Sequence, residues 1–152
     1  MMKALPEVVM TKVAFQARAC MPANRVQFAS EIASISYVDG TLIVLLATSR
    51  EHNDVSGMKI TFPGVDGFRL LDESYLARYT ASNDFPRGCH LLEVLAGGWS
   101  AEENALQGFA VTRREWLVVT GNACLSAFCL AEPELAEATW KFEANTQACQ
   151  IP

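Results

Sequence analysis

The stretch IASISYVDGTLIVLLAT, residues 32–48, decides the fold of this chain. Asp39-Gly40 stands between two β-rich runs, and this dipeptide supplies the positive φ angles of a two-residue type I′ turn. The stretch therefore predicts a β-hairpin. The residues that such a turn places opposite each other are Val38 with Thr41 and Tyr37 with Leu42. The second arm is apolar at successive positions, which predicts a central strand covered on both faces.

A second hairpin is predicted towards the C-terminus, where EWLVV (115–119) and ACLSAFCL (123–130) flank the turn residues TGN. Other short runs alternate apolar and polar residues or are rich in β-formers. These further extended segments are 13–19, 58–62, 68–71, 90–96 and 138–144. The segments predicted to lack regular structure are the break at Pro22 and Asn24, the polar loop 49–57, the turn 63–67, the loop 80–88 and the tail 145–152.

Short helices are predicted from capping residues. Asp72 is a residue type favoured at an N-cap, SAEE (100–103) fits the capping-box pattern, and proline suits a first helical position. The predicted helices are 73–79 after Asp72, one after Ser100 with Glu103 reaching back and Gly108 ending it, and a single turn over 133–138.

These elements predict a single α+β domain over residues 1–152. The sheet is expected to be mostly antiparallel, with seven or eight short strands and two or three short helices. It is expected to form either a curved sheet or two layers. The 152 residues fit one domain, and 51% hydrophobic against 19% charged residues is a globular composition.

The distribution of charged residues along the sequence indicates which kinds of partner the protein could bind. The net charge is −5; residues 1–50 contribute +2 and residues 51–152 contribute −7. Binding to a phosphate backbone needs a clustered basic face, so a nucleic-acid partner is not expected. An acidic body favours a basic protein partner, although net charge also serves solubility alone.

Catalytic and metal motifs are absent from the sequence. The five cysteines form no C-x-x-C pair and there are only two histidines, so neither a metal nor a cofactor is expected. Cys89 lies near Arg87 and His90, which favours an acidic thiol, but no base, orienter and oxyanion set surrounds it. An enzyme is therefore the least favoured class. It would require His52 or His90 to meet Cys89 or a carboxylate in space.

The N-terminal residues MMKALPEVVMTKV do not resemble a signal peptide, because Pro6, Glu7 and Lys12 interrupt the apolar region. The longest aliphatic run, residues 42–47, is far too short to span a membrane. A cytoplasmic protein without a membrane partner is therefore expected. The sequence leaves the oligomeric state open.

The stretch AGGWSAEENALQGF, residues 96–109, contains the residue whose purpose is least clear. Trp99 follows a glycine pair at the end of a predicted strand. Tryptophan is highly buried on average, which favours a packing anchor. It is also enriched at binding hot spots, so a contact residue is the alternative.

Three segments, VDGFRLLDESYLARY, LLEVLAGGW and EWLVVTGNACLSAF, occur in that order over about residues 60–130. Together they resemble a group of small, largely uncharacterised bacterial cytoplasmic proteins, some of which are of immunity-protein type. The shared motifs are structural rather than catalytic. The resemblance implies a protein that neutralises a partner toxin by binding it.

The leading hypothesis is thus a non-catalytic binding protein that blocks a basic toxin by stoichiometric binding. A small-molecule-binding β fold with a pocket inside the sheet is the alternative. Charge complementarity would speed association, and an aromatic side chain would hold the complex. The predicted partner-binding residues are Asp72, Glu73, Trp99, Glu102 and Glu103.

Overall fold

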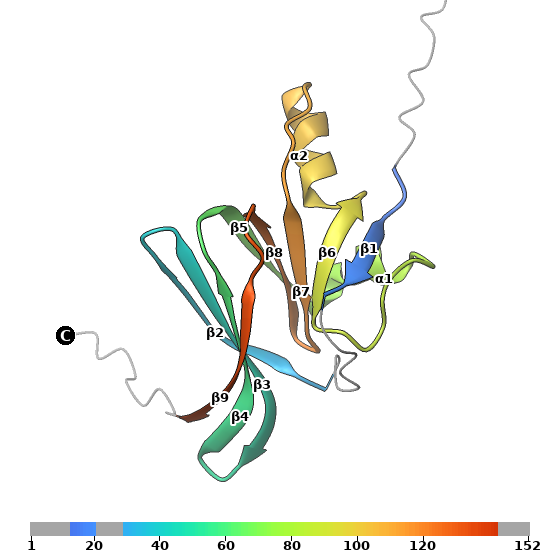
Figure 1. Cartoon of the computed structure of the whole chain (residues 1–152). Coiled ribbons are helices and arrows are strands. Elements are labelled where there is room, and N and C mark those ends of the chain that lie inside the picture. The colour runs from blue at the N-terminus through green and yellow to red at the C-terminus, as the bar shows by residue number, and fades with distance from the viewer. Residues whose placement is uncertain (1–12, 21–28, 143–152) are drawn as a thin grey trace, which may run out of the picture.

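A computed structural model describes residues 13–20 and 29–142 (Figure 1). Within these ranges the chain forms nine strands, two short α-helices and one 3₁₀ turn. The strands are β1 (Gln16–Ala19), β2 (Glu31–Val38), β3 (Thr41–Glu51), β4 (Asp54–Phe62), β5 (Val65–Asp72), β6 (Leu91–Ala96), β7 (Glu115–Val119), β8 (Ala123–Cys129) and β9 (Glu134–Lys141). The helical elements are η1 (Glu73–Tyr75), α1 (Ala77–Thr80) and α2 (Trp99–Gln107).

The strands form two antiparallel sheets. The five-stranded sheet has the order β1-β6-β7-β8-β5, and the four-stranded sheet has the order β2-β3-β4-β9. The predicted α+β class with a mostly antiparallel sheet is confirmed, and of the two expected arrangements the two-layer one is observed. The number of strands in the described part exceeds the predicted seven or eight. The predicted break at Pro22 and Asn24 and the tail 145–152 lie outside the described residues.

The hairpin at Asp39-Gly40 is confirmed with its predicted register. Both turn residues have positive φ, 49° and 80°, and β2 pairs with β3 as expected. β3 is an inner strand, between β2 and β4. Only one of its faces is fully covered, because Leu42, Val44 and Leu46 are buried while the residues between them are half-buried.

The polar loop predicted over 49–57 is wrong. β3 continues to Glu51 and β4 begins at Asp54, so a tight turn at His52 replaces the loop. The end of the β3–β4 hairpin near His52 is mostly exposed, so its residues can be polar. Backbone pairing between β3 and β4 holds the two strands together there. Gly57 is required there, since a Cβ atom would come within 1.7 Å of the carbonyl oxygen of Leu46.

The helical turn predicted over 133–138 is also wrong, because these residues open strand β9. β9 pairs along β4 from Glu134–Thr61 to Lys141–Asp54. Pro133 directly precedes the strand, where its missing N–H costs no ladder hydrogen bond. The edge of β4 offered a ladder of backbone partners, and that tertiary pairing outweighed the local helical signal.

Other boundaries differ by a few residues. β1 covers only the second half of the predicted 13–19 strand, although Phe15 before it is buried. β5 begins at Val65, inside the predicted turn 63–67. The predicted helix 73–79 is divided into η1 and α1, with Asp72 as N-cap as expected. The hairpin of β7 and β8 is confirmed.

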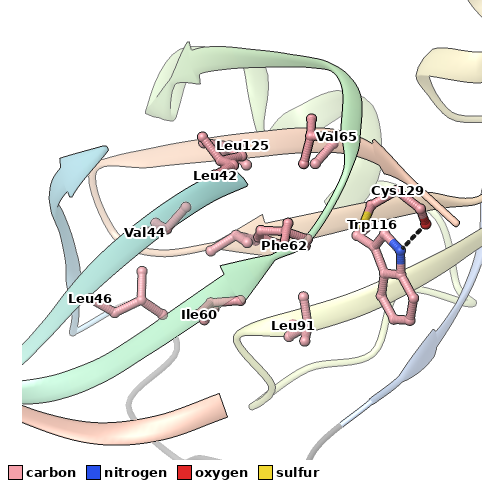
Figure 2. Packing of buried hydrophobic residues seen from close by; sticks show 12 residues of the cluster. Leu42, Val44, Leu46, Ile60, Phe62, Val65, Leu91, Trp116, Leu125 and Cys129 are labelled. Carbon is pink, nitrogen blue, oxygen red and sulfur yellow. Dashed lines mark hydrogen bonds between the residues drawn. The ribbon is translucent and has the colours of Figure 1, made fainter. Parts of the chain in front are cut away.

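Both faces of the five-stranded sheet are covered by apolar packing. One cluster fills the space between the sheets, where Leu42, Val44 and Phe62 face Leu125 and Trp116 (Figure 2). The indole Nε1 of Trp116 donates a hydrogen bond to the carbonyl oxygen of Cys129 at 2.8 Å. The second cluster lies on the opposite face, beneath the segment from η1 to residue 90. Its members are Phe15, Leu76, Tyr79, Phe85, Cys89, Leu92, Leu117, Val119 and Cys124.

Candidate functional site

Helix α2 carries three of the five predicted contact residues and begins directly after the glycine pair that ends β6. Its N-cap is Gly98 rather than Ser100, and the predicted capping box is wrong. The backbone N–H groups of Trp99 and Ser100 instead donate to the carboxylate of Glu115, on β7, at 2.9 and 2.7 Å. The predicted end at Gly108 is confirmed, with φ at 78°.

Glu115 fixes the start of α2 on the sheet. The side chain is only 2% exposed, and this burial raises the pKa of its carboxyl while the two backbone N–H groups lower it. Gly98 permits the close approach, because a Cβ atom there would lie 2.3 Å from a Glu115 oxygen. The positive end of the helix favours the carboxylate, but the cost of burying its charge is larger.

Trp99 is a packing anchor. Its half-buried ring stacks on Phe128 of β8, with centroids 4.1 Å apart and planes 14° apart. The far edge of the ring reaches Gly67 of β5, where a side chain larger than hydrogen would meet it at 3.5 Å. The indole Nε1 donates to Glu103 at 3.1 Å. The ring therefore crosses the sheet from β8 to β5 and leaves only part of its surface to a partner.

Glu102 is held by two arginines. Its carboxylate bonds Arg69 of β5 at 2.7 Å and Arg78 of α1 at 3.2 Å. Arg69 also donates to the hydroxyl of the buried Tyr79 at 3.1 Å. These bonds tie α2 to both the sheet and α1, so most of the charge of Glu102 is compensated within the molecule.

Asp72 and Glu73 lie at the end of β5, apart from α2. The carboxylate of Asp72 accepts the backbone N–H of Ser74 at 2.8 Å and also its hydroxyl, and both bonds lower the pKa of Asp72. Glu73 is exposed and takes part in no ion pair found among the described residues. Within that part of the chain, no hydrogen bond or ion pair joins these two residues to Trp99, Glu102 or Glu103.

The most exposed apolar side chains of this region were missed by the sequence reasoning. Leu106 is 82% and Phe109 61% exposed, and Val111 is also exposed. They lie on α2 and the segment after it, residues 99–113, which we call the α2 arm; Figure 1 shows it projecting from the end of the sheet. Asn104 folds the segment back by accepting the N–H of Val111 at 3.0 Å. The available signal was the apolar run at residues 109–111, directly after Gly108, the residue predicted to end the helix.

The residues that an enzyme would need are placed as follows. His90 is completely buried, its Nδ1 lies 3.1 Å from the carbonyl oxygen of Val119, and burial lowers its pKa. The buried Cys89 donates its thiol to the carbonyl oxygen of Leu91 at 3.2 Å. His52 is exposed in the turn between β3 and β4. Within the described ranges, no three His, Cys, Asp or Glu side chains gather as a metal site.

Comparisons with protein-family models, with curated proteins and with solved structures find no match. In the part of the chain that is described, no helix has the length and apolar character needed to cross a membrane.

Proposed function

We propose that the protein is a non-catalytic binding module, in its most concrete form an immunity-type protein that neutralises a basic toxin by stoichiometric binding. The observation that carries the proposal is the apolar end of the α2 arm. Leu106 and Phe109 expose most of their surface in the α2 arm, in which no residue is buried. Exposed apolar side chains gathered in one place are typical of interaction sites.

The proposed contact residues differ from those expected from the sequence, and they lie at the C-terminal end of α2 and just after it. Trp99 and Glu102 hold the arm to the sheet, so we assign them a supporting role. Leu106, Phe109 and Val111 supply the contact surface, which a partner with an apolar pocket would cover. The net charge of −5 supports a basic partner, because long-range attraction raises the association rate.

The test is capture of the partner from the source cell, followed by titration of the purified pair. We expect a basic protein bound at one-to-one stoichiometry. The Leu106→Ser/Phe109→Ser variant should bind at least about tenfold more weakly, because apolar anchors dominate such interfaces. Leu135→Ser, which changes an exposed leucine on β9, is the matched control and should bind like the wild type.

Equal binding by the Leu106→Ser/Phe109→Ser variant would remove the α2 arm as the contact surface. An acidic partner, or none, would count against the toxin-neutralising form of the proposal. A toxin partner should also lose its effect on growth when this protein is co-expressed, and should keep it when the variant is co-expressed.

A small-molecule site is the second candidate, and one observation favours it. Arg50, Val55 and Trp140 lie in register across β3, β4 and β9 and line a surface hollow. The guanidinium of Arg50 lies 3.6 Å from the ring centroid of Phe142 at its rim. A planar aromatic anion such as anilinonaphthalene sulfonate is a suitable probe. Its fluorescence should rise with the wild type and not with Trp140→Ala; equal signals would eliminate this site.

A further inference from the structure

The four edge strands of the two sheets differ in how they are protected. Exposed sheet edges are normally guarded by charge, proline or short length, because their free backbone groups can pair with another chain. β1 has only four residues and includes Arg18, and both β5 and β9 carry acidic and basic side chains. β2 is the exception: its one charge is Glu31 at the first position, and residues 32–38 contain neither a charge nor a proline.

The backbone of β2 is capped at one end only. The side chain of Asn122 accepts the N–H of Ile32 at 2.9 Å and donates to its carbonyl oxygen at 3.4 Å. Beyond that point, backbone groups of alternate residues face β3 or the open edge. Val38 closes the two-residue turn against Thr41, so Ile35 and Tyr37 direct their groups outwards. Among the described residues, nothing bonds these outward groups.

The side chains beside this edge are apolar and incompletely covered. Ile35 and Tyr37 stand opposite the buried Val44 and Leu42, so they face the space between the sheets. Tyr37 is still 51% exposed, and its ring contacts Phe68 of β5 at 5.6 Å between centroids. Leu70, further along β5, is 50% exposed. The two-layer structure is therefore open on the side where β2 and β5 form its edges.

We infer that a second copy of this chain closes this side by pairing its β2 with β2 across a twofold axis. A twofold interface requires a surface that is complementary to itself. Antiparallel pairing centred on Ser36 satisfies this requirement. It places Ile35 opposite Tyr37 of the second copy, a β-branched–aromatic pair of the kind that stabilises sheets. The outward N–H and C=O groups of Ile35 in one copy then form hydrogen bonds with those of Tyr37 in the other. The two four-stranded sheets, one from each copy, thereby join into one eight-stranded sheet.

The charges at the two ends of β2, Glu31 and Asp39, are compatible with a second copy. In this register Ser36 meets Ser36 of the second copy, and Asp39 stands opposite Ala33. No acid faces an acid, although each chain carries a net charge of −5. β2 is an edge of the four-stranded sheet, whereas the α2 arm connects two strands of the five-stranded sheet. Dimer formation and partner binding can therefore be tested separately.

The test is a charge placed at the twofold axis, read out by sedimentation velocity over a concentration series. The wild type should show a monomer–dimer equilibrium. Ser36→Lys should weaken the dimer about tenfold or more, because two lysines then stand directly opposite each other. Ser36 is exposed, so the monomer should keep the wild-type circular dichroism spectrum. Thr139→Lys, on the other edge of the same sheet, is the matched control and should dimerise normally.

Mixing Ser36→Lys with Ser36→Glu should restore a dimer, since opposite charges then meet. Amide hydrogen exchange at Ile35 and Tyr37 should slow in the dimer and not in Ser36→Lys alone. A wild type that stays monomeric would overturn the inference and leave this edge to a foreign strand. A dimer that Ser36→Lys does not weaken, or that Thr139→Lys weakens equally, would overturn it too.

Discussion

The carboxylate of Glu115 caps helix α2 through the backbone N–H of Ser100, at 2.7 Å, from a neighbouring strand. The start of α2 is therefore set by Glu115 of β7 rather than by a capping residue of the helix itself. The same carboxylate also accepts the N–H of Trp99, so one buried side chain satisfies two N–H groups of the first turn.

Glu115→Ala should destabilise the protein by about 2–4 kcal/mol, because it leaves two N–H groups of a helix start without their acceptor. Urea unfolding gives the magnitude, and faster exchange of the Trp99 and Ser100 amides gives the location. Glu103→Gln is the control: Glu103 is the residue of the expected capping box, and its loss should cost under about 0.5 kcal/mol. If both variants lost the same stability, Glu103 would have to contribute as much to the helix start as Glu115, as in the capping box first expected.

The stability contributed by Glu115 should depend on pH. Its pKa in the folded protein lies above the ordinary 4.5 because of burial, so the folded state binds the proton more tightly than the unfolded state. The contribution is complete below the unfolded pKa and is lost as pH rises through the folded pKa. The free energy of unfolding of the wild type, measured relative to Glu115→Gln, should therefore fall as pH rises from about 4.5. Parallel pH profiles would show that Glu115 does not titrate this way.

Removal of the Trp99 ring should weaken the attachment of α2 to the sheet. Trp99→Ala should cost about 2–4 kcal/mol, somewhat below a fully buried tryptophan. Trp99→Phe keeps a ring to stack on Phe128 but loses the bond to Glu103 and the ring edge that reaches Gly67, so a smaller loss of about 1 kcal/mol is expected. Chemical unfolding of both variants measures the difference. A Trp99→Ala variant as stable as wild type would show that the stacking contributes nothing.

The two arginines that bind Glu102 should contribute unequally. Arg69→Met should cost about 2 kcal/mol, since Arg69 is the more buried and its loss also removes the partner of the Tyr79 hydroxyl. Arg78→Met should cost about 0.5 kcal/mol, as for a partly exposed ion pair. Double-mutant cycles with Glu102→Gln, at low and high salt, measure each coupling. The reverse order of couplings would refute this ranking.

Both hairpins and the Asp72 cap were predictable because their signals are local. Asp39-Gly40 specifies its turn within two residues, and Asp72 bonds a residue two positions away. The errors arose where a distant partner decided the structure. β9 exists because β4 offers it an edge, and α2 begins where Glu115, from a later strand, reaches it.

Contacts between residues distant in sequence also decided the candidate site. Glu102 looked like a free acidic contact, but Arg69 and Arg78 approach it from other elements, which composition does not reveal. Conversely, the exposure of Leu106 and Phe109 depends on how far the α2 arm projects. The lengths of β3 and β4 were underestimated because polar strand ends, such as residues 49–51, resemble loops when their pairing is unknown.

The pairing of β4 with β9 has a consequence during synthesis. β4 ends at Phe62 and β9 begins at Glu134, and ribosomes add about 5–20 residues per second, so the edge of β4 stays bare for several seconds. The β2–β3–β4 meander emerges well before β9, with both of its edges open. Nascent chains on one message are therefore most prone to pair wrongly with each other in this interval, and a chaperone that shields β4 would protect them.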